Sequence, residues 1–350
     1  MLEQPQVPTP GARLSREEVE SLLFHPDAEI TASLARAARQ IRDRIYGRGV
    51  FIRGLIEFTS FCKNNCLYCG LRRSNALAER YRLSPEEILE CCEDGYRVGM
   101  RTFVLQGGED AYFTRKRMTD LLQEIKARYP DCAITLSIGE RSSEEYQAFF
   151  DAGAERYLLR HETATNAHYR FLHPPEMHLS NRMRCLKELR RIGYQVGCGM
   201  MVGSPGQMPE MLARDVEFLR AFMPEMVGLG PFIPHRQTPF AQEKAGSVET
   251  TLRLLSLVRL MLPSVLLPAT TALSTLDGEG RIRGLDAGAN VVMLNLSPQS
   301  VRKKYSLYDG KADCPDDART IWREFSATLE QNGYRAVVSR GDPAGKEEIE

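Results

Sequence analysis

The chain has 350 residues, of which 43% are hydrophobic and 26% are charged, and its formal net charge at pH 7 is zero. This balance argues against a nucleic acid as the main partner, because proteins that bind polyanions usually carry a basic surface. No apolar run reaches the ~18 residues of a membrane span. Nine cysteines without a secretory signal indicate a reducing compartment. We therefore expect a cytoplasmic protein that binds neither nucleic acid nor a membrane.

Two helical segments precede the first strand. Ser15 and Glu18 form a capping-box pattern that begins a short helix, and a second helix is expected over residues 32–46. The apolar run at 51–58 then predicts a strand. Residues 1–50 are therefore expected to form a tail and a helical prelude on the bottom or flank of the domain that follows.

Strand-like and helix-like segments alternate after this strand. Further strands are expected over residues 102–106, 132–138, 156–160, 195–202, 226–230, 266–269 and 290–294. Alternation with helices implies parallel strands, and eight such strands close into a barrel. The predicted fold class is α/β, with a complete (β/α)8 TIM-type barrel over residues 51–296. Residues 297–350 are expected to form a C-terminal extension that caps the barrel, with the irregular part folding over its mouth.

Three cysteines follow the first strand at the spacing CxxxCxxC, namely Cys62, Cys66 and Cys69. Thiolates bind soft metals and iron–sulfur clusters. Three of them on one loop can hold three irons of a four-iron cubane and leave the fourth iron without a protein ligand. A structural zinc site would need a further Cys or His nearby, but Cys91 and Cys92 lie in an expected helix. The pattern therefore favours a cluster over zinc.

Other polar residues fall where strands are expected to end, which is the functional face of a barrel. The loop Gly107-Gly108-Glu109-Asp110 combines glycines, which let a ligand approach the backbone, with a carboxylate. Glu162 and Arg182 lie on the same face, where they either pair with each other or grip a ligand.

Two arginines, Arg156 and Arg160, alternate along one expected strand, so both are expected to point into the barrel. Buried arginines need anionic partners. Small polar groups on neighbouring strands add donors, namely Gln106, Thr135, Ser137, Thr270 and Thr271. An anionic substrate and a polar layer satisfied by water both remain open interpretations.

The cysteine loop, with Tyr68 just before its last cysteine, resembles that of the radical S-adenosylmethionine (radical SAM) superfamily. In that superfamily the open iron takes the amino and carboxylate groups of SAM, and one electron cleaves SAM to a 5′-deoxyadenosyl radical. Longer runs resemble the FeFe-hydrogenase maturase family HydE. These runs lie at residues 56–75, 80–82, 105–110, 156–163, 230–239 and 268–272.

This resemblance implies one 4Fe-4S cluster, bound SAM and a large internal cavity. The SAM contacts that it implies are Tyr68, Gly108, Glu109, Arg160, Glu162 and Arg182. The residues that it places at the substrate are Gln106, Thr135, Arg156, Thr270 and Thr271. The implied role is in assembly of the hydrogenase di-iron centre, on an organometallic iron–cysteine substrate delivered by a partner maturase, with an external electron donor.

One feature departs from the family pattern. Some HydE members carry an accessory cluster on three cysteines near the C-terminal end of the barrel, whereas Cys314 is the one cysteine in that region of this chain. We therefore expect a single cluster. Two sibling radical SAM enzymes, biotin synthase and methylornithine synthase, remain alternatives, as does a non-catalytic iron–sulfur carrier.

Overall fold

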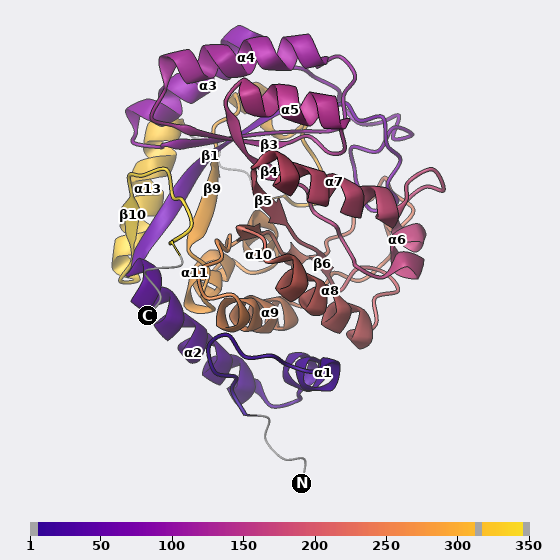
Figure 1. The fold of residues 1–350 in the computed structure, drawn as a ribbon, viewed down its shortest axis with the longest axis vertical. Coiled ribbons are helices and arrows are strands. Elements are labelled where there is room, and N and C mark those ends of the chain that lie inside the picture. The colour runs from indigo at the N-terminus through magenta and orange to yellow at the C-terminus, as the bar shows by residue number, and fades with distance from the viewer. Residues whose placement is uncertain (1–5, 312–316, 346–350) are drawn as a thin grey trace.

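The computed structural model describes residues 6–311 and 317–345. At its centre an eight-stranded parallel sheet curls inside a ring of helices (Figure 1). The sheet order is β10-β1-β2-β3-β4-β5-β7, and β9 pairs with the other edge of β1. The strands are β1 (Gly49–Thr59), β2 (Thr102–Gly107), β3 (Ala133–Ser137), β4 (Ala154–Leu158), β5 (Gln195–Cys198), β7 (Met226–Val227), β9 (Val291–Asn295) and β10 (Arg335–Val337), with β6 (Met201–Val202) and β8 (Gly230–Pro231) forming a separate pair.

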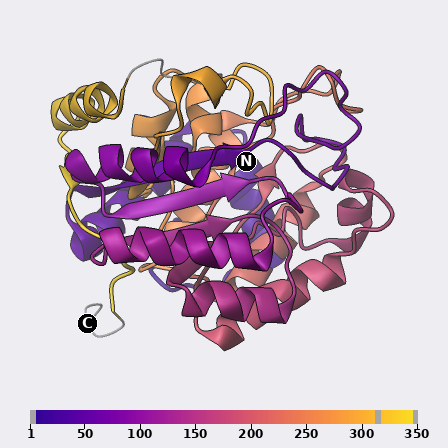
Figure 2. The same cartoon turned by 90° about the horizontal axis from the view of Figure 1, so that it is seen from above.

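Helices connect successive strands and cover the outside of the sheet, as the view from above also shows (Figure 2). Three of them begin with a complete capping box, at Ser15, Ser84 and Ser142, in which the serine and a glutamate three residues on satisfy each other's backbone donors. The helices are α1 (Arg16–Phe24), α2 (Ala28–Tyr46), α3 (Pro85–Arg97), α4 (Arg115–Arg128), α5 (Ser143–Asp151), α6 (Asn166–Leu172), α7 (Leu179–Ile192), α8 (Pro209–Phe222), α9 (Val248–Met261), α10 (Thr271–Leu276), α11 (Gly280–Asp286), α12 (Gln299–Arg302) and α13 (Ala318–Gln331).

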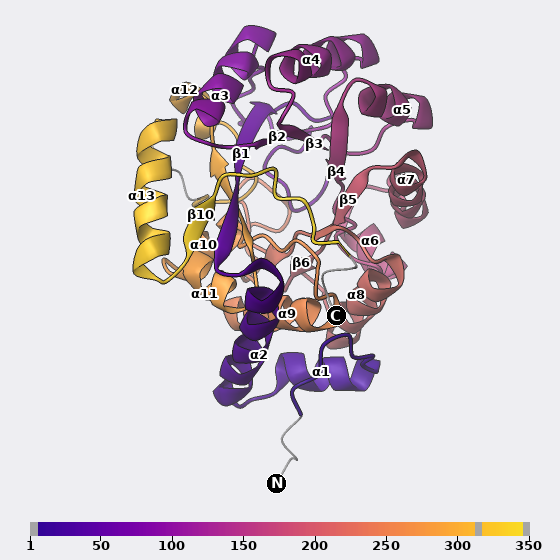
Figure 3. The same ribbon diagram turned by 60° about the vertical axis from the view of Figure 1, so that its left-hand side comes forward.

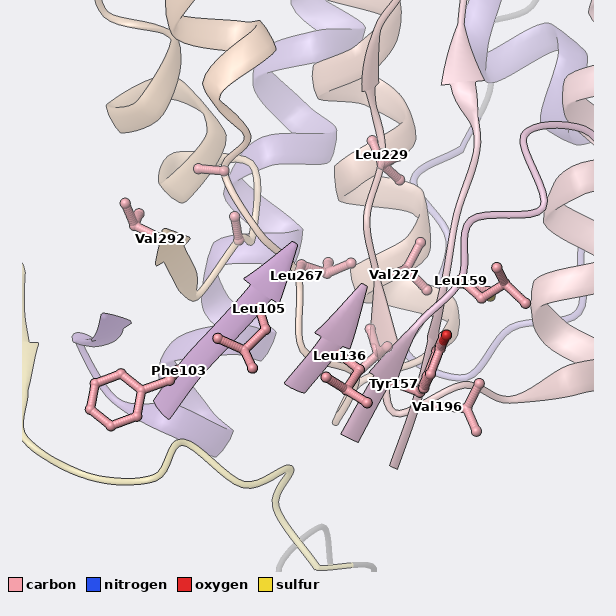
Figure 4. Packing of buried hydrophobic residues seen from close by; sticks show 14 of the residues in the cluster. Phe103, Leu105, Leu136, Tyr157, Leu159, Val196, Val227, Leu229, Leu267 and Val292 are labelled. Atoms are coloured by element: carbon pink, nitrogen blue, oxygen red, sulfur yellow. The ribbon is translucent and has the colours of Figure 1, made fainter. Parts of the chain in front are cut away.

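The hydrophobic core runs along the strands, with side chains from successive strands in one buried cluster (Figure 4). Phe103 and Leu105 of β2, Leu136 of β3 and Tyr157 of β4 are all fully buried. Residues two apart on a strand share a face, so the alternate residues of the same strands line the interior of the sheet. The sheet therefore separates a hydrophobic layer under the helices from a mixed interior.

The predicted parallel α/β architecture is confirmed, but the regular strands alone do not form the complete eight-stranded barrel that was expected. The expected strand at 195–202 is divided into β5 and β6. Gly199, at φ +154°, lies against the next strand so closely that a Cβ on it would be 1.9 Å from the Gly228 carbonyl oxygen. The ladder between these two parallel neighbours is interrupted at this close contact and resumes in the same register as the β6–β8 pair.

The expected strand at 266–269 is replaced by isolated parallel bridges. Leu266 pairs with Met226 of β7, and Pro268 pairs with Val291 of β9. Proline has no N–H to donate to a ladder, so a regular strand is interrupted at Pro268. The curled sheet therefore continues from β7 towards β9 through single bridges.

The N-terminal and C-terminal segments lie on the outside of the sheet. Helix α2 packs against α9 and α1 against α8, on the flank of the helix ring (Figure 1). Helix α13 leads into β10, which pairs with the first residues of β1 (Figure 3). The chain then crosses the N-terminal ends of the strands, where Thr102 Oγ1 donates to the Arg340 carbonyl at 2.7 Å.

Arg156 lies at this end of the sheet, and not at the substrate cavity as expected. It is the middle residue of β4, and its guanidinium donates to the Asp342 carboxylate at 2.7 Å and the Arg340 carbonyl at 2.9 Å. Arg53 of β1 is buried nearby, where burial and the charge of Arg156 lower its pKa. The anionic partner that a buried arginine requires is thus supplied by the C-terminal segment itself.

We predict that Asp342→Asn lowers the free energy of unfolding by about 1–2 kcal/mol at pH 7, a range typical of lost charged hydrogen bonds at a half-exposed group. Burial alone would raise the pKa of Asp342, but hydrogen bonds from Gln195 and Arg156 hold it below its ordinary value. Its stabilisation is therefore present at neutral pH and is lost as the pH falls below about 4. Urea unfolding of both proteins at pH 7 and at low pH measures the difference.

The control for this variant is Asp120→Asn. Asp120 forms an exposed ion pair with Lys116 within α4, and we expect a change of less than about 0.5 kcal/mol. Equal destabilisation by the two substitutions would show that Asp342 does not hold the buried arginines.

Candidate functional site

A cavity of about 370 Å³ lies at the C-terminal ends of the strands. Cys62, Cys66 and Cys69 all line it, on the loop that follows β1. The structure brings most of the expected site residues to the same cavity, namely Tyr68, Gln106, Gly108, Glu109, Arg160, Glu162, Arg182, Thr270 and Thr271. Residues that are far apart in the chain therefore meet at one end of the sheet, as the barrel argument predicts.

Two expected substrate residues do not line this cavity. Arg156 is held at the opposite end of the strands by Asp342. Thr135 lies two residues before Ser137, which does line the cavity, and is therefore deeper on the same face of β3. Thr135 is 1% exposed, and its Oγ1 has no hydrogen-bond partner among the described residues. Thr135 thus belongs to the layer between the cavity and the Arg156 end.

The cysteines are in an environment that opposes free thiolates. Burial raises the pKa of Cys62, and burial together with the charge of Cys62 raises the pKa of Cys69 to about 12. Burial followed by the charges of Cys69 and Cys62 raises the pKa of Cys66 as well. Metal ligation requires the deprotonated thiolates, so a positively charged centre is needed to hold three of them together.

The arrangement of these thiols fits three corners of a 4Fe-4S cluster, because they converge on one cavity from one loop. In the described part of the chain, no three His, Cys, Asp or Glu side chains are grouped as a site for one metal ion. A cubane uses its cysteines differently, since each binds a separate iron. Cys314, which bears on a second cluster, lies outside the described residues.

The loop after β2 packs directly on the cysteine loop. A Cβ on Gly108 would be 2.2 Å from the Phe61 carbonyl oxygen and 2.6 Å from Cys62 Cβ, so only glycine fits there. Lys63 N donates to the Glu109 carbonyl at 3.0 Å, and Lys63 Nζ lies 3.1 Å from the Glu109 carboxylate. The Glu109 carboxylate is thereby held at the edge of the cavity.

Two arginines connect the cysteine loop to the body of the domain. The guanidinium of Arg80 donates to the backbone carbonyls of Leu71 at 3.0 Å and Arg72 at 2.8 Å. The guanidinium of Arg82 donates to both oxygens of Asp110, at 2.7 and 3.0 Å. Such bidentate pairs define orientation as well as distance, so the two loops are held in one relative position.

Glu162 and Arg182, which were expected to pair with each other or to grip a ligand, have other partners. Glu162 Oε2 lies 3.1 Å from Arg160 Nη2, and Arg182 Nε donates to Glu140 Oε1 at 2.6 Å. Sequence reasoning missed Glu140, although its place directly after the β3 end and Gly139 could have indicated it. The Arg160 Nε and Nη2 atoms have no hydrogen-bond partner among the described residues.

Glu162 adopts a left-handed backbone conformation, φ +65°, which is uncommon for a residue other than glycine. The preceding residue, His161, is fully buried and lies with Nε2 3.4 Å from the Asp215 carboxylate of α8. Asp215 also accepts a hydrogen bond from Ala164 N. Asp215 therefore contacts the chain both before and after the strained Glu162, at His161 and at Ala164, from outside the cavity.

Tyr68 has a defined partner beside the cysteines. Burial lowers the pKa of His173 to about 3, so its imidazole is neutral. His173 Nδ1 donates to the Tyr169 carbonyl at 2.8 Å, which leaves Nε2 to accept from the Tyr68 hydroxyl at 3.2 Å. This hydrogen bond sets the orientation of the Tyr68 ring at the cavity wall.

A segment after β9 covers one side of the cavity mouth. Gly70 N donates to the Leu307 carbonyl at 2.9 Å, and Asp309 N donates to the Pro234 carbonyl at 3.0 Å. Residues of this segment that line the cavity are Tyr305, Leu307, Tyr308 and Lys311. These residues belong to the stretch that was expected to lie over the mouth.

Comparison with known proteins agrees with this geometry. Residues 56–219 match the Radical SAM superfamily. The chain is 44% identical over 297 residues to the "[FeFe] hydrogenase maturase subunit HydE" of Thermotoga maritima, covering 85% of this chain and 84% of that protein. The chain belongs to the HydE family of radical SAM enzymes.

More distant members of the superfamily cover the chain as well. This chain is 30% identical over 318 residues to the 3-methylornithine synthase of Methanosarcina barkeri, with 90% of this chain and 89% of that protein covered. A crystal structure of methylornithine synthase (PylB) superimposes with a TM-score of 0.81 at 29% identity, over 93% of this chain and 95% of that one. Within the described residues, no helix has the length and hydrophobicity to cross a membrane.

We predict that Cys66→Ala removes bound iron and the broad iron–thiolate absorption at roughly 400 nm from anaerobically reconstituted protein. Three cysteines bind three of the four irons, so loss of one cysteine leaves two irons without a protein ligand. We therefore expect that the cluster is not retained. Iron analysis and absorption spectra measure this. Cys91→Ala is the control, because Cys91 is buried in α3 and does not line the cavity; undiminished iron in the Cys66 variant would contradict the ligand set.

We predict that Asp215→Asn weakens SAM binding about tenfold while the iron content stays unchanged, because the residues around Glu162 lose a charge-assisted support. Calorimetric titration with SAM measures the affinity. His168→Gln is the control, since His168 is also buried but bonds to the Pro205 carbonyl away from Glu162. If both variants bind SAM equally well, Asp215 has only a general structural role.

Proposed function

We propose that this enzyme binds one 4Fe-4S cluster on Cys62, Cys66 and Cys69 and uses SAM in hydrogenase maturation. The observation that carries the proposal is the convergence of these three half-buried thiols on a cavity, in a chain 44% identical to HydE. When bound, the cluster would supply the electron that cleaves SAM to a 5′-deoxyadenosyl radical, as in other members of this superfamily. The protein's own part is to hold SAM, orient it and keep water away.

The residues proposed to hold SAM surround the cysteines on two sides. Gly108 lines the cavity beside Cys62, and the Glu109 carboxylate is suited to the ammonium group of SAM. On the other side, Glu162 is suited to ribose hydroxyls. Arg160 pairs with Glu162 through Nη2, and its Nε, which has no hydrogen-bond partner among the described residues, is suited to a carboxylate. Arg182 and Tyr68 complete the proposed set, with Tyr68 beside the adenine.

The proposed substrate is a sulfur-containing iron–cysteine species, by analogy with the HydE resemblance. Gln106, Thr270 and Thr271 line the cavity and would face it. Thr270 Oγ1 is buried without a hydrogen-bond partner among the described residues, which supports a role towards a ligand. Partner maturases, an external electron donor and a cytoplasmic location are part of the same proposal.

We also propose that the isolated bridges at Leu266 and Pro268 close the sheet into a complete (β/α)8 barrel over residues 51–296. Helical segments 1–50 and the extension 297–350 are then additions to this barrel. In a closed barrel the cavity would be reached from the mouth, where residues 305–311 line it.

Methylornithine synthase is the alternative function, because its solved structure superimposes over most of this chain. The higher identity to HydE, 44% against 30%, favours maturation. The two are separated by their substrates. Conversion of lysine to methylornithine by the reconstituted enzyme would support the alternative, whereas replacement of HydE in a hydrogenase maturation assay would support the proposal.

The direct test is the formation of 5′-deoxyadenosine from SAM by the reduced, reconstituted enzyme, measured by liquid chromatography. We predict that Glu162→Gln weakens SAM binding by about tenfold or more with the cluster intact, because a charged hydrogen-bond acceptor is lost. Glu79→Gln, on an exposed part of the segment after the cysteines, is the control. An enzyme without SAM turnover would be an iron–sulfur carrier, and the proposal would fail.

A further inference from the structure

Glu57 and Lys311 form a charge pair on one wall of the cavity. The HydE resemblance assigns no role to either residue. Glu57 of β1 is fully buried and lines the cavity, and its Oε1 forms an ion pair with the ammonium of Lys311. Lys311 comes from the segment over the mouth, and its side chain is 15% exposed. Strands β2 and β3 separate this wall from β4 and Arg160.

The pair is held by neighbours that also face the cavity or its rim. Asn295 Nδ2 donates to Glu57 Oε2 at 2.9 Å, and Lys311 Nζ donates to the Tyr305 carbonyl at 3.1 Å. Gln106 lies beside Glu57 in the register of β1 and β2. An ammonium has three N–H donors, and Glu57 and Tyr305 account for two of them in the described contacts.

We propose that Glu57 and Lys311 together bind a zwitterionic α-amino acid group of the substrate, with its carboxylate at Lys311 and its ammonium at Glu57. The inference rests on the proposed function and specifies how the same cavity selects its substrate. Burying a charge without a partner is costly. A ligand with one charge would separate the pair and leave the other member uncompensated, whereas a zwitterion supplies a partner to each.

The remainder of the cavity fits this orientation. Apolar side chains also line the cavity, among them Leu55, Leu158, Met201 and Met293. A substrate held by its amino acid group at Glu57 and Lys311 would have its side chain against this apolar lining. The side chain, which carries the sulfur in the proposed substrate, would then share the cavity with Arg160 and Glu162 of the proposed SAM site.

The test uses three probes that differ only in charge. S-methyl-L-cysteine carries both groups, 2-(methylthio)ethylamine lacks the carboxylate, and 3-(methylthio)propionate lacks the ammonium; the methyl group prevents ligation of iron by a thiol. Titration calorimetry on the cluster-loaded enzyme with SAM measures their affinities. We expect S-methyl-L-cysteine to bind at least about tenfold more tightly than either analogue, since each charged contact contributes about that factor.

The variants assign each half of this preference. In Lys311→Met the preference over 2-(methylthio)ethylamine is expected to disappear, and in Glu57→Gln the preference over 3-(methylthio)propionate. The double variant leaves no unpaired buried charge, so it stays testable if a single variant does not fold, and it should lose both preferences. Lys303→Met, an exposed lysine on the same segment that does not line the cavity, should keep both.

The outcomes separate this inference from the proposed function. Absence of SAM cleavage in the wild-type enzyme would overturn the proposed function itself. An active wild-type enzyme that binds the three probes equally, or binds none of them, would overturn only the zwitterion site. So would a double variant that retains the preference for S-methyl-L-cysteine.

Discussion

The three half-buried thiols after β1 set the constraint on which the rest of the site depends. Three cysteines at the edge of a cavity are unfavourable as thiolates, because burial and mutual repulsion raise their pKa values. They can act as ligands only where a metal centre compensates their charge. The close contact of Gly108 with Cys62 and the bidentate Arg82–Asp110 pair keep the loop in the one position where the thiols converge.

Compensation of buried charge also organises both ends of the strands. At the mouth, Arg182 pairs with Glu140, Glu162 with Arg160, and Glu57 with Lys311. At the opposite end, Arg156 pairs with Asp342. Arg160 and Glu162 lie on either side of His161 in one loop. In the other three pairs the two partners come from different loops or segments. These three pairs therefore join separate parts of the chain as well as neutralising a charge.

Much of the architecture could be predicted because its signals are local. The capping boxes at Ser15 and Ser84 and the alternation of strands with helices depend on residues close in sequence. The divided strands were missed because the interruption at Gly199 arises from contact with Gly228, on another strand. The short helices α6 and α10 have no side-chain cap hydrogen bond, so they lack the local signal that marks the capping-box helices.

By itself the sequence determined the three-cysteine spacing, the parallel α/β pattern and the family to which the chain belongs. The tertiary structure decided which charged groups face the cavity. Arg156 and Arg160 have the same strand parity, yet one lies beside Asp342 and the other beside Glu162, because position along a strand determines which end a side chain reaches. Glu57 and Lys311 are 254 residues apart, and no local pattern indicates a contact at that separation.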